Sequence, residues 1–154
     1  MNTPDHLHVR RVEAEMVVRH ERRISLRIPS DFHLIEQVIE VVARHCVEMG
    51  MPATAARFNL RVALSEALSN AMEYGNGLDT EKVVDVTAQV FDDRVQIQVS
   101  DQGHGFDPGD IPDPTHATNL EHPGGRGLFL IRQLVDEVSF NDRGNAICMI
   151  WHSA

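Results

Sequence analysis

The sequence predicts one α+β domain, built as a two-layer sandwich with three helices on one face of a mostly antiparallel, mixed sheet. Several short segments alternate apolar and polar residues, which is typical of strands with one covered face. Three longer segments instead repeat apolar residues at helical spacing. At 154 residues the chain has room for one domain with a substantial core.

Composition and charge restrict the partners and the compartment. The net charge is −9, which disfavours nucleic acid and anionic membranes as partners, because both attract clustered Lys and Arg. No apolar segment resembles a secretion signal or is long enough to span a bilayer. Cys46 and Cys148 lie far apart in apolar segments and are interpreted as buried thiols in a reducing compartment rather than a disulfide. We therefore expect a cytoplasmic protein.

The amino-terminal part is predicted to be a polar arm over 1–22, in which 16–20 forms a short strand, followed by the domain proper over 23–152. A strand is expected over 24–28, where aliphatic residues alternate with polar ones before Pro29. A first helix follows, with Ser30 or Asp31 as its cap and Gly50 and Pro52 at its end.

Two histidines on this first helix, His33 and His45, raise the question of a metal site. No cysteine or acidic partner stands at ligand spacing from either of them. Both are therefore expected to face solvent or to lie at the boundary of the core.

The second helix is predicted to begin near Pro52–Thr54 and to end at Gly75. Its apolar stripe consists of Leu60, Leu64, Ala67, Leu68 and Ala71. Glu66 and Asn70 are four residues apart, so their side chains stack on one face at the rim of the core. A glutamate in such a helix is usually only solvated. The alternative is a helix that offers a base and a metal-ligand oxygen to a cleft.

A β-hairpin is predicted over 84–99, with its turn at Asp92–Asp93, and it leads into Asp101-Gln102-Gly103-His104-Gly105. A carboxylate at a strand end can accept a hydrogen bond from an exocyclic amine such as that of adenine, although an ordinary Asp-Gly turn has the same residues. The proline-rich stretch that follows, up to about Pro123, is interpreted as a lid. Its histidines, His104, His116 and His122, are expected to be solvated rather than metal ligands.

The third helix is predicted to follow Gly125-Arg126-Gly127, and strands over 138–140 and 146–151 close the sheet around an Asn141–Gly144 turn. The N–H groups at such a helix start form a natural phosphate seat, but glycines there also permit close helix packing. A Walker loop is excluded, because the only lysine, Lys82, is not part of a Gly-x-x-x-x-Gly-Lys motif.

Four features occur in a fixed order: a helix with Glu-x-x-x-Asn, a strand ending in Asp-x-Gly-x-Gly, a long loop, and a Gly-x-Gly helix. As a set they resemble the Bergerat (GHKL-type) ATP-binding fold of gyrase, Hsp90-type chaperones, histidine kinases and MutL-type proteins. From about Ile24 to Trp151 the chain resembles the anti-sigma-factor serine/threonine kinases. The phrases Ala-Leu-Ser-Glu-Ala-Leu-Ser-Asn-Ala (63–71) and Gly-Arg-Gly-Leu-Phe-Leu-Ile (125–131) are especially similar to that branch.

The resemblance implies ATP and Mg²⁺ as cofactors. It implies that Glu66 is the general base for a substrate hydroxyl and that Asn70 ligates Mg²⁺ between the phosphates. Asp101 would hold adenine. The walls of the nucleotide pocket and the phosphate seat would come from Gly103, Gly105, Gly125, Arg126, Gly127 and Leu128.

The function implied by the resemblance is that of an ATP-dependent serine/threonine protein kinase. Its partners would be a small STAS-type anti-anti-sigma protein and a sigma factor or other regulator, and it would form a homodimer. The alternative is a non-catalytic, ATP-dependent switch that acts on a phosphatase or another regulator. The catalytic piece of a histidine kinase is disfavoured, because the residues before 23 leave no room for a phosphoacceptor hairpin. A purely structural fold would leave the four-part motif unexplained.

Overall fold

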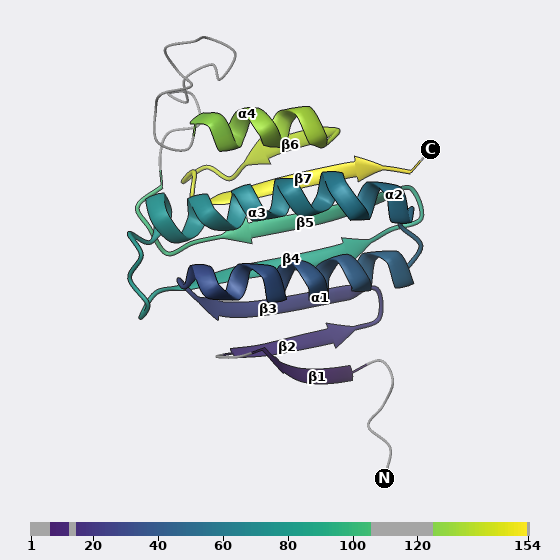
Figure 1. Cartoon of the computed structure of the whole chain (residues 1–154), viewed down its shortest axis with the longest axis horizontal. Coiled ribbons are helices and arrows are strands. Elements are labelled where there is room, and N and C mark those ends of the chain that lie inside the picture. Colours follow the sequence, from purple (N-terminus) through teal and green to yellow (C-terminus); the bar gives the residue numbers. More distant parts are fainter. Residues whose placement is uncertain (1–6, 13–14, 106–124, 154) are drawn as a thin grey trace.

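A computed structural model describes residues 7–12, 15–105 and 125–153 of the chain. These residues form a seven-stranded sheet in the order β1-β2-β3-β4-β5-β7-β6, with the helices in a layer on one face (Figure 1). The strands are β1 (Leu7–Val12), β2 (Glu15–His20), β3 (Arg23–Pro29), β4 (Val83–Val90), β5 (Arg94–Ser100), β6 (Glu137–Phe140) and β7 (Ala146–His152). The predicted two-layer α+β sandwich is confirmed. All six pairings between these strands are antiparallel, so the described part of the sheet is not mixed.

The helical layer contains the three predicted helices. They are α1 (Ile35–Glu48) with a 3₁₀ turn, η1 (Phe32–Leu34), before it, a continuous run of α2 (Ala53–Ala55), η2 (Ala56–Leu60), α3 (Arg61–Asn70) and η3 (Ala71–Gly75), and α4 (Gly125–Leu134). The run over 53–75 has the extent predicted for the second helix, but η2 and η3 are π-helical turns. Turns of this type inside α-helices are frequent at functional sites.

The core lies between the helices and the covered face of the sheet. All five stripe residues of the second helix are buried, so the sequence identified its inner face correctly. In β4 every second residue is buried, as expected for a strand with one covered face. Leu64 and Leu68 are completely buried, and truncating a side chain in such a place to alanine costs about 2–5 kcal/mol.

The end of α1 follows from its glycine. Gly50 adopts a φ of +115°, its N–H donates to the carbonyl of Val47 at 3.0 Å, and the Met51 N–H donates to Cys46 at 2.9 Å. These two bonds form a Schellman motif, in which glycine adopts the left-handed conformation without strain. Of the two predicted caps, Ser30 and Asp31, Asp31 accepts from the His33 N–H at 2.9 Å at the start of η1.

The amino-terminal segment contains two strands rather than one. The expected pairing of 16–20 is present, because β2 pairs with β3. The strand β1 over 7–12 was not predicted, and it pairs with β2. Its alternation is short, because Leu7 and Val9 are followed by two arginines, Arg10 and Arg11, so the pattern that marks a half-buried strand is weak there. The boundary of the nucleotide-binding domain at residue 23 stays a prediction.

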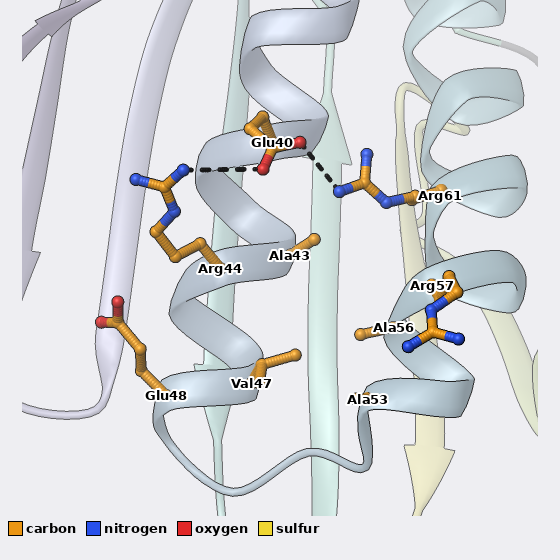
Figure 2. Close-up of a pocket in the computed structure, with 9 residues that line it drawn as sticks. All are labelled: Glu40, Ala43, Arg44, Val47, Glu48, Ala53, Ala56, Arg57 and Arg61. Carbon is orange, nitrogen blue, oxygen red and sulfur yellow. Dashed lines mark hydrogen bonds and ion pairs between the residues drawn. The ribbon is translucent and has the colours of Figure 1, made fainter.

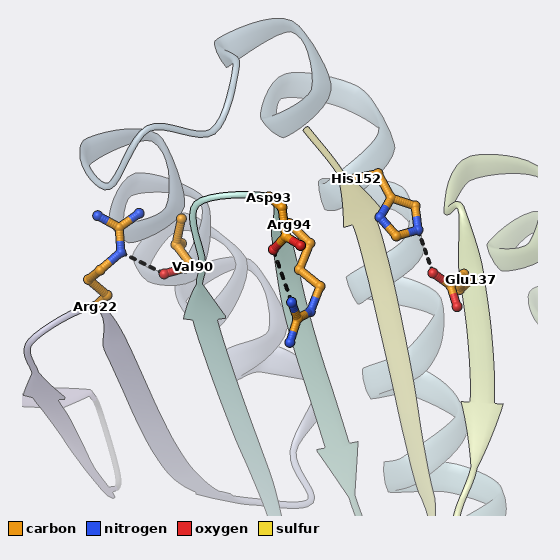
Figure 3. A network of polar contacts seen from close by, with 6 residues as sticks. All are labelled: Arg22, Val90, Asp93, Arg94, Glu137 and His152. Carbon is orange, nitrogen blue, oxygen red and sulfur yellow. Dashed lines mark hydrogen bonds and ion pairs between the residues drawn. The ribbon is translucent and has the colours of Figure 1, made fainter. Parts of the chain in front are cut away.

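The end of the sheet at the β4–β5 turn is joined by polar contacts (Figure 3). The Nε–H of Arg22 donates to the Val90 carbonyl at 2.6 Å, and a terminal N–H of the same guanidinium donates to Met49, just after α1, at 3.1 Å. Across β6 and β7, the ring of His152 bonds to the carboxylate of Glu137. Arg22 thus ties the end of α1 to the strands beneath it.

The two cysteines are free. Cys46 is buried as predicted, and burial raises the pKa of its thiol to about 12. Cys148 is only partly buried, so the prediction holds for one of the two residues. Among the described residues, no helix has the length and apolar character needed to cross a membrane.

His45 is entirely buried, so the expectation of a solvent-facing or boundary histidine was wrong for this residue. It stands three residues after Val42, on the apolar face of α1. Its Nε2–H donates to the carbonyl of Arg22 at 3.0 Å, and its Nδ1 has no partner in the described part of the chain. His33, by contrast, is exposed as expected.

The buried His45 should make stability depend on pH. Burial lowers its pKa below the ordinary value of 6.5, against the opposing effect of the bond to Arg22. The unfolded chain then binds a proton more readily than the folded chain, so the free energy of unfolding falls as the pH drops through 6.5. The His45→Gln variant retains a donor for Arg22 but does not titrate. We expect urea unfolding to show a smaller loss of stability for this variant than for the wild type between about pH 7.5 and pH 5.5. Equal losses would contradict this account.

Candidate functional site

Glu66 and Asn70 lie one turn apart on α3, both half-buried beside the apolar stripe. Gly127 of α4 packs directly on them. A Cβ atom at Gly127 would lie 2.8 Å from Oε2 of Glu66 and 3.1 Å from Nδ2 of Asn70. A side chain at this position would therefore push the ends of these two side chains away from the start of α4. The structure brings together three of the predicted site residues that are up to 61 positions apart in the sequence.

The position of α4 depends on contacts along the whole helix. It begins at Gly125, Arg126 is exposed, and Leu128 is buried with Gly127. Near the other end, Ile131 is completely buried, and the indole N–H of Trp151 in β7 donates to the Leu134 carbonyl at 2.9 Å. The bond from Trp151 fixes the last turn of α4 to β7. This anchorage helps to keep the first turn of the helix beside Glu66 and Asn70.

Asp101 directly follows β5 and is half-buried. Its Oδ1 accepts a hydrogen bond from the Gly103 N–H at 2.8 Å. A Cβ atom at Gly75 would lie 2.3 Å from the Cγ and Oδ2 of Asp101, and one at Gly103 would lie 2.1 Å from the Gly75 carbonyl oxygen. The end of η3 and the loop after β5 therefore pack closely through the backbones of Gly75 and Gly103. The Asp101 carboxylate packs against Gly75 at the same place.

The electrostatic surroundings of Asp101 set its pKa. Burial raises the pKa of this carboxyl above its ordinary value of 3.8, and the Gly103 N–H and the charge of Lys82 oppose that rise. The second carboxylate oxygen, Oδ2, has no protein donor in the hydrogen bonds of the described residues. This oxygen is therefore able to accept a hydrogen bond from a ligand.

Gly105 packs against the turn between β6 and β7. Its φ is +77°, and a Cβ atom there would lie 1.8 Å from the carbonyl oxygen of Arg143. The same turn is joined to Asp101, whose N–H donates to the Asn145 carbonyl at 2.9 Å, while Nδ2 of Asn145 donates to the Asp101 carbonyl at 3.2 Å. These contacts hold the loop over 101–105 in place from the side of β7.

The predicted residues thus form two groups along one helical run. Glu66 and Asn70 meet α4, and Gly75 meets Asp101 and Gly103. Asn70 and Gly75 are five residues apart, or roughly 7 Å along the helix axis. Most of the predicted lid lies in 106–124, with His116 and His122, and these residues lie outside the described part of the chain; His104 is exposed.

Three residues in this region were not identified from the sequence: Gly75, Asn76 and Asn145. Gly75 was interpreted only as a helix end. Asn76 is buried and bonds to residues as far away as Ser30 and Gln102, so no local pattern reveals its role. The one available signal is the Gly-Asn-Gly sequence after the helix, and such a sequence is common in solvated turns.

A metal ion with oxygen ligands fits the first group. Asn70 supplies an amide oxygen, a ligand type that Mg²⁺ accepts, the Glu66 carboxylate lies beside it, and Mg²⁺ usually completes its shell with phosphates and water. Gly127 leaves free the space that a Cβ atom would occupy beside them. Within the described ranges, no three His, Cys, Asp or Glu side chains gather closely enough to hold a metal by themselves.

A separate groove lies between α1 and the run over 53–61 (Figure 2). Glu40 spans it, with an ion pair to Arg61 at 2.8 Å and a second one to Arg44 at 3.6 Å. Arg61 lowers the pKa of Glu40. None of the motif residues lines this groove, so it is not part of the site described above.

Comparisons with known proteins agree with this geometry. Residues 28–151 match the family model described as a histidine kinase-like ATPase domain. The chain is 31% identical over 98 residues to the serine-protein kinase RsbW of Oceanobacillus iheyensis, covering 60% of this chain and 62% of that protein. The RsbW proteins of Bacillus licheniformis and Bacillus subtilis are 37% and 34% identical over 98 residues, covering 59% of this chain and 61% of each protein. The chain therefore matches about three-fifths of the length of these relatives.

A solved structure shows the same fold. It contains the RsbU and RsbW domains of a Mycobacterium tuberculosis protein, and it aligns with a TM-score of 0.59 over 89% of this chain and 34% of that one. At 18% sequence identity, the likeness concerns the architecture alone.

Proposed function

The chain belongs to the histidine kinase-like ATPase domain family, and we propose that it is an ATP-dependent serine/threonine protein kinase. Its substrate is a small STAS-type anti-anti-sigma protein, and phosphorylation of that protein controls a sigma factor or another regulator. We propose that it acts in the cytoplasm as a homodimer. The similarity to RsbW serine-protein kinases supports this proposal. The observation that carries it is the packing of Gly127 on Glu66 and Asn70, because it joins a carboxylate and an amide to a helix start.

Glu66 is the proposed general base. Phosphoryl transfer to a hydroxyl depends on positioning of the acceptor, on neutralisation of charge and on a group that takes the acceptor's proton. Glu66 is half-buried and sits beside the first turn of α4. A serine or threonine hydroxyl presented at that turn would donate its proton to the carboxylate.

The phosphates are proposed to bind at the start of α4. The free N–H groups of residues 125–128 and the positive end of the helix dipole favour anions, and the exposed guanidinium of Arg126 adds a charge. Asn70 would hold Mg²⁺, which neutralises phosphate charge when bound. The adenine ring would lie at Asp101, whose Oδ2 would accept a hydrogen bond from the adenine amine. Gly103 and Gly105 would shape the wall of the adenine pocket.

The test uses the purified protein with MgATP and each STAS-type protein encoded in the same genome. Phosphopeptide mass spectrometry should find phosphate on one serine or threonine of one of these proteins. ATP binding without any phosphate transfer would overturn the kinase proposal and favour the alternative, in which ATP only switches the binding of a phosphatase or another regulator.

Asp101→Asn should weaken ATP binding by about 10- to 150-fold, the range expected for a hydrogen bond to a charged group. Gly103 already donates to one oxygen, so asparagine would turn its amide N–H toward the adenine amine. The change should not lower stability at neutral pH. Because the pKa of Asp101 is higher in the folded chain than the ordinary value of 3.8, its carboxyl stabilises the fold at a pH below 3.8. That stabilisation is lost as the pH rises through the raised pKa. Asparagine does not ionise, so the variant does not lose stability in this way. Calorimetric titration with MgATP and thermal unfolding measure the two effects.

The wild type should also lose ATP affinity as the pH falls, and this loss should begin at a higher pH than for an aspartate of ordinary pKa, because the protonated carboxyl no longer accepts the amine. Asp92→Asn, at an exposed position in the β4–β5 turn, is the matched control and should behave as the wild type. Tight ATP binding by Asp101→Asn would contradict the proposed role of Asp101.

A further inference from the structure

Asn76 is the most highly connected buried polar side chain near the proposed site. It is 2% exposed. Its Oδ1 accepts from the Gln102 N–H at 2.8 Å, and its Nδ2 donates to Oγ of Ser30 at 2.9 Å and to the carbonyl of Val83 at 3.0 Å. One acceptor and two donors are what a carboxamide offers, so every polar atom of this side chain is used.

These bonds join the helical run to three strands. Asn76 follows η3, whereas its partners lie just after β3, at the start of β4 and just after β5. Gln102 strengthens the junction, because its side-chain oxygen accepts from the Val83 N–H at 2.7 Å. The side chain of Asn76 therefore connects the run that carries Glu66 and Asn70 with the backbone next to Asp101.

We propose that Asn76 is a positioning residue for recognition of the nucleotide base, and that it acts through Asp101. The peptide N–H that it holds belongs to Gln102, directly after Asp101. The glycine before it, Gly75, packs on the Asp101 carboxylate. Asn76 thus holds the backbone at Gln102 on one side of the Asp101 carboxylate, and the neighbouring Gly75 packs on its other side. This inference rests on the proposed function, since it assigns a purpose to the geometry of the proposed ATP site.

The expected consequence is a loss in binding rather than in the chemical step. Asn76→Ala leaves the Gln102 N–H without its acceptor, so the loop over 101–103 gains freedom and Asp101 is no longer held for the base. We expect the Kd for MgATP to rise about 10-fold, which corresponds to about 1.4 kcal/mol. The hydrogen bonds of Asn76 go to Ser30, Val83 and Gln102 and not to the phosphate end at Glu66 and Gly127. We therefore expect kcat at saturating ATP to change less than about 2-fold.

A double-mutant cycle with Asp101→Asn distinguishes positioning from general stability. If Asn76 acts through Asp101, the Kd of the double variant should equal that of Asp101→Asn within about 2-fold, because the carboxylate that Asn76 positions is already gone. Two independent losses would multiply, and that result would overturn the proposal. Calorimetric titration at a temperature where circular dichroism shows every variant folded provides the four Kd values.

Two further variants complete the test. His45→Gln changes another buried polar residue, one that bonds near the opposite end of β3, and it should leave the Kd for MgATP unchanged. Asn76→Asp keeps an oxygen for the Gln102 N–H, and its carboxyl donates one hydrogen bond when it is protonated. This variant should bind MgATP within about 3-fold of the wild type, even if Asn76→Ala fails to fold.

The possible outcomes separate this inference from the proposed function. If the wild type binds no MgATP, both are overturned. If the wild type binds and folded Asn76→Ala binds equally well, only the role of Asn76 is overturned. The role of Asn76 alone is also overturned if Asn76→Asp folds but binds MgATP more than about 10-fold more weakly than the wild type.

Discussion

Replacing Glu66 with glutamine should slow phosphate transfer by about 10²–10⁴-fold and leave ATP binding nearly unchanged. Glutamine has the same shape, so the packing against Gly127 is retained, but its amide cannot take a proton from a hydroxyl. A positioned base contributes about 10²–10⁴-fold to the rate. We expect a loss of that size in the single-turnover rate of phosphate transfer to the STAS-type substrate, with the Kd for MgATP changed by less than about 3-fold.

Glu73→Gln is the control for Glu66→Gln. It makes the same chemical change in η3, seven residues further along the same helical run, at an exposed side chain. Its transfer rate should equal that of the wild type. Unimpaired phosphate transfer by Glu66→Gln would contradict the assignment of Glu66 as the general base. A loss of ATP binding in the same variant would indicate that Glu66 is a metal ligand instead.

Gly105→Ala is expected to have the largest effect on stability of any single methyl addition in the site. The Cβ would lie 1.8 Å from the Arg143 carbonyl oxygen, and the φ of +77° already disfavours an L-residue. A left-handed residue costs about 1–2 kcal/mol and overpacking a further 1–3 kcal/mol, so we expect about 3 kcal/mol or a fall in Tm of roughly 6–12 °C. The loop over 101–105 must move away from the β6–β7 turn, so ATP affinity should fall as well.

Gly77→Ala separates the cost of a left-handed backbone conformation from the cost of a steric clash. Gly77 has a φ of +63°, similar to that of Gly105, but a Cβ atom there would have no neighbour within 4 Å. This variant should lose only the conformational term, about 1–2 kcal/mol, and should bind MgATP as the wild type does. Thermal unfolding of both variants gives the comparison. Equal Tm values would show that the turn at Arg143 yields easily and that Gly105 is not required for close packing.

The sequence predicted most of the elements because their signals are local. Alternation located β3, β4, β5 and β7, and the i, i+4 stripe identified the buried face of α3, since a strand or a helix must show one face to the core. The same reasoning did not identify β1, whose alternation is interrupted by two adjacent arginines, or the burial of His45, whose ring bonds to a carbonyl 23 residues away. Burial of a polar side chain depends on a distant partner that a local pattern does not contain.

The candidate residues of the site were likewise selected from local spacing. Glu66 with Asn70, Asp101 with its glycines, and the Gly-x-Gly start of α4 each form a short motif, and the order of the motifs indicated the family that the comparisons confirm. What each of these residues does stays a prediction.

By itself, the sequence determined which faces are apolar and what fold class they build, and it singled out the motif residues as candidates, because these properties follow from side-chain type and spacing along the chain. Only the tertiary structure decided how closely the motifs approach one another: Gly127 lies on Glu66, Gly75 lies on Asp101, and Asn76 bonds to residues 7, 26 and 46 positions away. The physical reason is that hydrogen bonds and backbone packing act over a few ångströms in space whatever the separation in sequence, and a pattern of neighbouring residues does not encode which distant atoms will meet.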